Sequence, residues 1–232
     1  MRLKLRIVIG LVGIMATMLV SCGGKKFEKT PLDKYIIEFE DEPEYSVILA
    51  DMDVDGTFFK TYKHKYKVIR VKDSLPYETA SNWKEVNSDF FRKNENNLGM
   101  TVLAKDINGK LSKVAAPPGY RYVGDRHYGE WRNHNGNSFW AFYGQYMFMS
   151  HMFGMMHRPV YRGAYNSYRT GGYYGSRNYY GPKQGTGHMY GTNSAQTKKS
   201  NPNFYKRRAS KSGWSGSRSR SGGRSRGSGF GK

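Results

Sequence analysis

The pattern Asp51-x-Asp53-x-Asp55-Gly56 places three carboxylates at alternate positions before a glycine. Calcium loops begin in this way because carboxylate oxygens converge on a hard cation and the glycine permits a sharp turn. The twelfth position counted from Asp51 is Tyr62, where such a loop carries a bidentate glutamate. The alternative interpretation is a strand connection whose aspartates cap backbone amides. Asp51, Asp53 and Asp55 are therefore candidate calcium ligands in a pattern that lacks one ligand.

A second set of metal-binding residue types lies in the charge-free segment 139–156, which is followed by His157. On a helix, Met147, His151 and Met155 would fall at i, i+4 and i+8 and share one face. Thioether and imidazole ligands together favour Cu(I). The alternative is that methionine fills apolar space, and that an uncharged helix packs against protein or lipid. We predict an apolar helix over 137–157 that lies against the membrane or the body.

The chain contains one cysteine, Cys22, at the end of an N-terminal segment that resembles an export signal. Three basic residues, Arg2, Lys4 and Arg6, precede an uncharged stretch over 7–20. A helix of 14 residues rises only about 21 Å, which is short of the roughly 30 Å hydrocarbon core of a bilayer. These features predict a signal peptide over 1–21 that is removed, and not a permanent membrane span.

The four residues Leu19-Val20-Ser21-Cys22 resemble the lipobox of bacterial lipoproteins. This resemblance implies cleavage before Cys22 and a diacylglycerol or acyl lipid (palmitate) on its thiol, so that a flexible leader over 22–33 follows the anchor. The alternative is an ordinary secretory signal with an unrelated cysteine. Lipidation would leave no thiol for a disulfide or a thiolate metal site. The position after Cys22 is glycine and not aspartate, which in a Gram-negative bacterium favours the outer over the inner membrane.

Residues 157–232 contain 16 lysines and arginines and no acidic residue, which accounts for most of the net charge of +20. Because this segment has few aliphatic residues, we predict that 158–232 is disordered. The predicted anion-binding residues are arginines, and neighbouring tyrosines would stack on sugars or rings. The arginines are Arg207, Arg208, Arg218, Arg220, Arg224 and Arg226, and the tyrosines are Tyr173, Tyr174, Tyr179 and Tyr180.

In a cytosolic protein this arginine- and tyrosine-rich composition would favour RNA binding. Export changes the expected partner, so no cytosolic nucleic acid is expected. The anions at a cell envelope are lipid headgroups, lipopolysaccharide and acidic polymers, and all of them attract a polycation through salt-sensitive contacts. The alternative is a solvated basic tail without a partner.

Between these segments, the pattern predicts a small α+β domain over 34–131, mostly antiparallel. Short β-forming runs over 34–40, 45–50 and 58–68 predict strands. A capping pattern at Asn82 predicts a helix of about 14 residues. The pair Asn108-Gly109 predicts a hairpin between 100–105 and 111–115.

The motifs of serine hydrolases, P-loop NTPases and zinc proteases do not occur in the sequence. The adjacent acids Asp41 and Glu42 offer no acid and base assignment. We therefore expect a non-enzymatic envelope lipoprotein that is anchored through Cys22 and binds an anionic surface or polymer. The alternative is a metal-handling envelope protein for copper or calcium.

Overall fold

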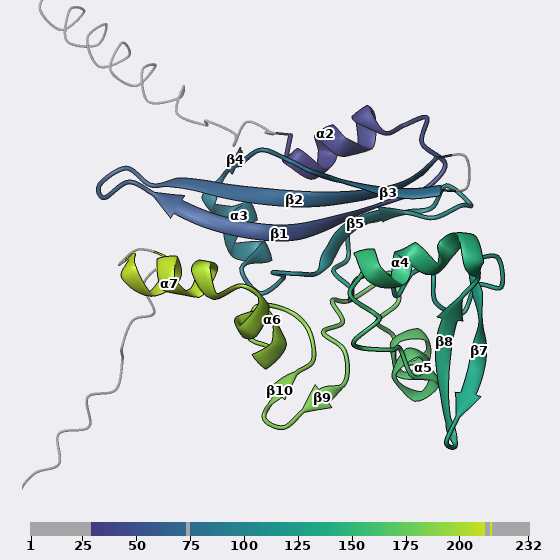
Figure 1. Cartoon of the computed structure of the whole chain (residues 1–232). Helices are drawn as coiled ribbons and strands as arrows, with labels where there is room; N and C mark the ends of the chain where they lie inside the picture. The colour runs from purple at the N-terminus through teal and green to yellow at the C-terminus, as the bar shows by residue number, and fades with distance from the viewer. Residues whose placement is uncertain (1–28, 73–74, 212–213, 215–232) are drawn as a thin grey trace, which may run out of the picture.

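The computed structural model describes residues 29–72, 75–211 and 214. Its main feature is a six-stranded antiparallel sheet with the order β3-β2-β1-β5-β6, in which β4 also pairs with β2 (Figure 1). The strands are β1 (Tyr45–Asp55), β2 (Thr61–Lys72), β3 (Leu75–Ala80), β4 (Lys84–Val86), β5 (Thr101–Lys105) and β6 (Leu111–Ser112). The fold class is therefore α+β, as the sequence predicts.

The long hairpin of β1 and β2 forms the centre of this sheet, and its register shifts between Leu49 and Asp51. Val47 and Leu49 are buried before the shift, and Met52 and Val54 are buried after it in the same apolar cluster. The bulge therefore changes the alternation, so that odd-numbered residues face the core before it and even-numbered residues face the core after it. After the bulge, Asp51, Asp53 and Asp55 alternate with Met52 and Val54. Their side chains therefore point away from that cluster.

Two short helices pack against the sheet. Helix α2 (Pro31–Glu38) covers residues 34–38 of the run 34–40, so the prediction of a strand there is wrong. Thr30 forms a capping box with Asp33, and Pro31 stands in the first helical turn, so the start signals of a helix outweigh the β-forming residues that follow. Tyr35 of α2 packs against Tyr66 of β2.

Helix α3 (Ser88–Asn94) begins later than the helix predicted from Asn82. Lys84–Val86 form strand β4 because they pair with β2, and Asn87 caps the helix that follows. The predicted hairpin at Asn108-Gly109 is confirmed, since β5 pairs with β6 across it and Gly109 has a φ of +77°.

The predicted helix over 137–157 is wrong, and so is the predicted domain boundary at 131. Strands β7 (Gly129–His134) and β8 (Asn137–Phe142) form a hairpin around Asn135 and Gly136, both at positive φ. The turn signal thus joins 129–142 into one unit. A 3-10 turn (Gly144–Tyr146) and helix α4 (Met147–Met152) follow.

The prediction of disorder over 158–232 is wrong for residues 158–211. This segment contains α5 (Arg162–Thr170), β9 (Lys183–Gln184), β10 (Gly187–His188), α6 (Ala195–Ser200) and α7 (Pro202–Ser210). Tyr168, Tyr179 and Tyr190 are buried, and their rings contact Tyr120. Tyrosine rings supply the apolar area that the few aliphatic residues do not. Residues 212–213 and 215–232 lie outside the described residues.

Two apolar clusters organise the described residues. One contains the α2 side chains, β1 and β2 residues, Phe91 of α3, Phe204 of α7 and Trp214. The other joins Ile48 and Ile69 of the sheet to the buried aromatic residues of the second half of the chain. The described helices include none that is long and apolar enough to cross a bilayer.

Candidate anion-binding site

A cavity of about 350 Å³ lies where the connection after β6 meets α5. Three arginines line it, namely Arg121 and Arg126 of the connection and Arg169 of α5. The tyrosines among its lining residues are Tyr122, Tyr128, Tyr165 and Tyr174. The cavity therefore combines guanidinium groups with aromatic rings.

The connection between β6 and β7 is held by its alternate side chains. Tyr120 and Tyr122 are buried, and the Tyr122 hydroxyl lies 3.1 Å from the hydroxyl of Ser46 on β1. Arg121 between them is half-buried and donates through Nη2 to the Ser112 hydroxyl at 2.5 Å and to the Val114 carbonyl at 3.3 Å. The alternation thus fixes the Arg121 guanidinium at the cavity wall.

Gly124 brings this connection close to α5. Its φ is +84°, and a Cβ atom there would lie 2.4 Å from the Tyr165 hydroxyl oxygen. A larger residue would be strained in this conformation and would also displace the Tyr165 ring. The glycine therefore allows the connection and α5 to form one cavity wall.

Two arginines of the cavity and the nearby Lys110 face one aromatic ring. The guanidinium carbon of Arg169 lies 4.0 Å from the centroid of Tyr174, that of Arg121 lies 5.9 Å away, and the Lys110 ammonium lies 5.7 Å away. A ring face attracts each cation weakly and leaves its N–H donors available. Arg121, Arg126 and Arg169 form no ion pair with any described residue.

Two carboxylates also line the cavity, but their oxygens serve the local turns. Asp106 Oδ1 accepts from the backbone N–H groups of Asn108 and Lys110 at 3.1 and 2.9 Å. Asp125 Oδ1 accepts from the N–H of His127 at 2.9 Å. Three guanidinium groups against two turn-capping carboxylates leave a surplus of positive charge, which suits an anion.

A second cavity, of about 570 Å³, adjoins the first and shares Gly124 and Arg126 with it. Trp131 and Trp140 line it with their ring centroids 5.2 Å apart, and the Arg162 guanidinium lies 5.8 Å from the Trp131 ring. The buried Trp140 Nε1 has no acceptor among the described residues. Indole faces are suited to contact with a sugar or another polar ring.

The two cavities together offer Arg121, Arg126, Arg162 and Arg169 beside aromatic rings. Guanidinium groups bind carboxylate, phosphate or sulfate through paired hydrogen bonds. Aromatic faces add contact area for a ring that carries such groups. The arrangement is suited to a polymer in which anionic groups alternate with rings.

The predicted calcium ligands are engaged by cations of α7 and the residue after it. Arg207 Nη2 lies 2.6 and 2.7 Å from the two oxygens of Asp51, and Lys211 Nζ lies 2.7 Å from Asp53 and 2.9 Å from Asp55. Lys63 also pairs with Asp55 at 2.8 Å. Hydrogen bonds from Lys63 and Lys211 lower the Asp55 pKa to about 2. Protein cations thus occupy the positions around these carboxylates.

The predicted copper ligands do not share a helical face. Met147 and His151 lie on α4, but the helix ends at Met152, before Met155. Met155 is buried beside Gly119, whereas Met147 is 64% exposed. The described residues contain no group of three or more His, Cys, Asp or Glu side chains that could hold a metal ion.

The predicted anion-binding arginines have different positions. Arg207 is in ion pairs with Asp51 and Asp53, whereas Arg208 is half-buried and forms no ion pair with any described residue. Arg218, Arg220, Arg224 and Arg226 lie outside the described residues, as does Cys22. Of the four predicted stacking tyrosines, Tyr174 lines the first cavity.

The cavity arginines are not among the anion-binding residues predicted from the sequence; they are Arg121, Arg126, Arg162 and Arg169. Arg121 and Arg126 stand in the predicted α+β domain over 34–131, and Arg162 and Arg169 stand in the segment 158–232 that is predicted to be disordered. A usable signal was the tyrosine–arginine alternation at Tyr120-Arg121-Tyr122, which recurs as Tyr161-Arg162 and Tyr168-Arg169.

The comparisons with known proteins add no relative to this description. No protein-family model matches the chain, and neither the curated proteins nor the solved structures contain a significant match.

Proposed function

We propose that the protein is a non-enzymatic envelope lipoprotein, anchored through a lipid on Cys22, that binds an anionic polymer at the site formed by Arg121, Arg126, Arg162 and Arg169. The observation that carries the proposal is that these guanidinium groups line two adjoining aromatic cavities without forming an ion pair with any described carboxylate. A binding surface with unneutralised arginines beside rings attracts a polyanion that also carries rings.

The principal anion contact is thus in the two cavities and not at the C-terminal arginines that the sequence predicts. Arg207 is neutralised by its ion pairs with Asp51 and Asp53, so it contributes little to binding an anionic ligand. Arg208, Arg218, Arg220, Arg224 and Arg226 add a non-specific attraction that falls with salt. Acidic polysaccharides and phosphate-bearing polymers of the envelope have the required chemistry.

Two labelled polyanions test this proposal, an oligogalacturonate that carries carboxylates on rings and an inorganic polyphosphate without rings. We expect the double variant Arg126→Gln/Arg169→Gln to weaken oligogalacturonate binding by about 10- to 100-fold, since a hydrogen bond contributes roughly 0.5 to 1.5 kcal/mol net and the variant removes two such contacts. The matched control Arg92→Gln removes an exposed arginine of α3 that pairs with Asp89. Equal binding by the double variant and the control would contradict the proposed site.

The same titrations separate the site from the C-terminal segment. A chain that ends at residue 215 keeps Trp214 of the apolar cluster and lacks Arg218, Arg220, Arg224 and Arg226. We expect it to lose polyphosphate affinity and to retain the preference for the ring-bearing ligand. If truncation abolishes binding of both polyanions, the C-terminal segment and not the cavity is the binding element.

A further inference from the structure

The tip of the β1–β2 hairpin exposes two adjacent phenylalanines. Phe58 is 94% exposed and Phe59 is 93% exposed, whereas most large apolar residues of the sheet are buried. Single apolar residues on a surface are common, but two neighbouring aromatic rings at a protruding tip indicate a contact with something apolar. Figure 1 shows this hairpin extending beyond the rest of the sheet.

The hairpin tip has a defined shape. The strands pair up to Asp55 and Thr61, and Lys63 closes the base of the tip by pairing with Asp55 at 2.8 Å. Gly56 has a φ of +87°, and a Cβ atom there would lie only 2.0 Å from the Phe59 carbonyl oxygen. The tight turn therefore depends on glycine, and it presents both rings on the outside of the loop.

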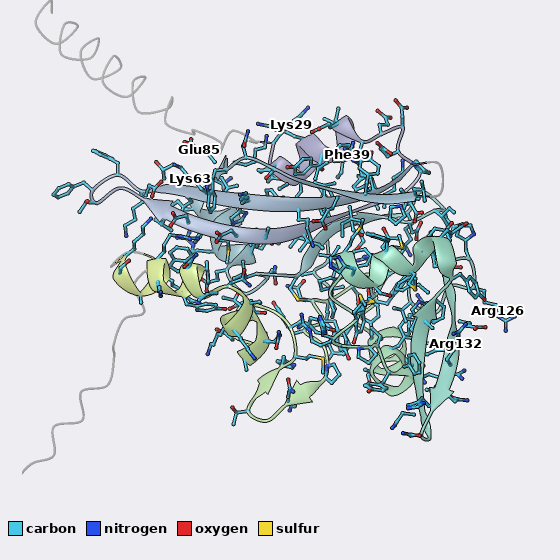
Figure 2. All side chains as sticks on the ribbon, viewed as in Figure 1. Lys29, Phe39, Lys63, Glu85, Arg126 and Arg132 are labelled. Atoms are coloured by element: carbon cyan, nitrogen blue, oxygen red, sulfur yellow. The ribbon has the colours of Figure 1, made fainter. Side chains whose placement is uncertain are left out.

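The first described residue lies at the same end of the molecule. Lys29 lines a small depression together with Glu85 of β4, and Glu85 pairs with Lys63 next to the hairpin tip. Figure 2 shows Glu85 and Lys63 toward the hairpin tip, and Lys29 beside the start of α2. Cys22 precedes Lys29 by seven residues, which can span at most about 25 Å. A lipid on Cys22 would therefore hold the membrane close to this end.

The chain also reaches this end near its C-terminus. Lys211 pairs with Asp53 and Asp55 at the outer part of β1, seven residues before Arg218. Trp83, which is 40% exposed, lies there too, 5.9 Å from the Arg207 guanidinium. Phenylalanine and tryptophan rings with nearby basic residues have the composition of membrane-interface contacts.

We propose that Phe58 and Phe59 insert into the interface of an anionic lipid bilayer, so that the hairpin tip is a second membrane contact beside the lipid anchor. This inference rests on the proposed function for the anchor alone. The apolar rings gain by leaving water, and the exposed lysines Lys29, Lys84 and Lys206 at this end are attracted to anionic headgroups. Two contacts at one end fix the orientation of the protein, which a flexible anchor alone does not.

This orientation has a consequence for the anion-binding site. Arg126 lies beside the β7–β8 hairpin, at the opposite end from Lys63 and Lys29 (Figure 2). When the β1–β2 tip contacts the bilayer, the arginine-lined cavities therefore face away from the bilayer. It would connect the membrane to a polymer above it.

Site-specific labelling of the full lipidated chain in vesicles of phosphatidylglycerol and phosphatidylethanolamine tests the insertion. The variant Phe59→Cys is labelled with an environment-sensitive fluorophore, and His134→Cys at the β7–β8 turn is the matched control. We expect a blue shift and quenching by spin-labelled lipid at position 59, and neither at position 134. Equal exposure to water at both positions would overturn the proposal, as would a blue shift that needs no vesicles and grows with protein concentration, which indicates a second copy of the chain on the tip.

Failure of the anchor is measured separately. Mass spectrometry of Cys22 reports whether the lipid is present, whatever the hairpin does. For the unanchored full chain with Cys22→Ala, we expect Phe58→Ser/Phe59→Ser to weaken sedimentation with phosphatidylglycerol vesicles by about 10- to 100-fold. The control Phe148→Ser removes a ring of α4 that is 67% exposed. No difference between the double variant and this control would overturn insertion even where Cys22 is acylated.

Discussion

Arg207 on α7 places one nitrogen, Nη2, within 2.6 and 2.7 Å of both carboxylate oxygens of Asp51 on β1, although 156 residues separate them. The pairing lies where no described strand pairs with β1 on the side of β5, because β5 pairs with β1 only over Tyr45 to Ile48. Helix α7 therefore covers the open edge of the outer half of β1. An exposed edge strand is a site for unwanted pairing with another chain, and a covering helix prevents it.

The first prediction concerns this contact between α7 and β1. We expect Arg207→Ala to lower the free energy of unfolding by about 1 to 2 kcal/mol, because the substitution removes a charge-assisted pair that is partly exposed and so partly screened. Urea denaturation measures the change. The neighbouring Arg208→Ala, whose guanidinium forms no ion pair with a described residue, is expected to change it by less than about 0.5 kcal/mol. Equal effects of the two substitutions would show that the ion pair between Arg207 and Asp51 does not contribute to the free energy of unfolding.

This pairing also shows what the sequence could and could not predict. The row Asp51, Asp53 and Asp55 was identifiable as a cation site from its spacing, because alternate residues of a strand share a face. Its cations are Arg207 and Lys211, which come from a segment predicted to be disordered. Spacing identifies the carboxylates, but a partner more than 150 residues away leaves no local signal.

The second half of the chain was harder to predict for a related reason. Tyr120, Tyr168, Tyr179 and Tyr190 form a buried cluster, although a count of aliphatic residues predicts too little apolar area for order. The tyrosine ring supplies that apolar area, but its hydroxyl makes the residue equally suited to disordered segments. A high tyrosine content therefore does not predict order. The strong local signals, such as Asn108-Gly109 and the β-forming run over 45–50, gave correct predictions because adjacent residues determine them.

The second prediction concerns calcium. Because Arg207, Lys211 and Lys63 already neutralise Asp51, Asp53 and Asp55, we expect calcium at about 1 mM, the range of weak extracellular sites, to leave the melting temperature unchanged. Calorimetry with calcium is expected to give no binding heat for the intact chain. A calcium-dependent rise in the melting temperature that Asp53→Asn removes would instead support the calcium interpretation.

The third prediction concerns His64, a fully buried histidine on β2. Its Nδ1 lies 2.9 Å from the Tyr66 hydroxyl, and its ring packs against Phe90 and Phe91. Burial lowers the His64 pKa from 6.5 to about 3. Between these values the unfolded chain binds a proton that the folded chain does not, so the free energy of unfolding falls as the pH decreases from 6.5 toward 3.

We expect His64 to account for a loss of stability on the order of 2 to 4 kcal/mol over that range. The variant His64→Gln keeps a hydrogen-bonding side chain but does not titrate, so its stability should depend less on pH than that of the natural chain. Denaturation at pH 7 and pH 5 measures both chains. Parallel pH profiles for the two would exclude His64 as the source.

The fourth prediction concerns Glu44, which is buried and accepts a hydrogen bond of 2.6 Å from the Tyr128 hydroxyl. Burial raises the Glu44 pKa, and the Tyr128 hydrogen bond opposes that shift. In this case the folded chain holds the proton more tightly than the unfolded chain does. The stability contribution of Glu44 therefore decreases as the pH rises from 4.5 through its folded pKa, which is opposite in sign to that of His64.

Tyr128→Phe leaves the buried carboxylate without this donor, so we expect it to cost about 1 to 3 kcal/mol at pH 8. A larger fraction of Glu44 is protonated at pH 5 than at pH 8, and a protonated side chain needs the donor less, so the cost should be smaller at pH 5. The double variant Tyr128→Phe/Glu44→Gln removes the charge and should show the same cost at both pH values. Since Tyr128 also lines the arginine cavity, oligogalacturonate binding to Tyr128→Phe distinguishes a role in stability from one in recognition. A cost of Tyr128→Phe that is independent of pH would mean that Glu44 stays protonated throughout.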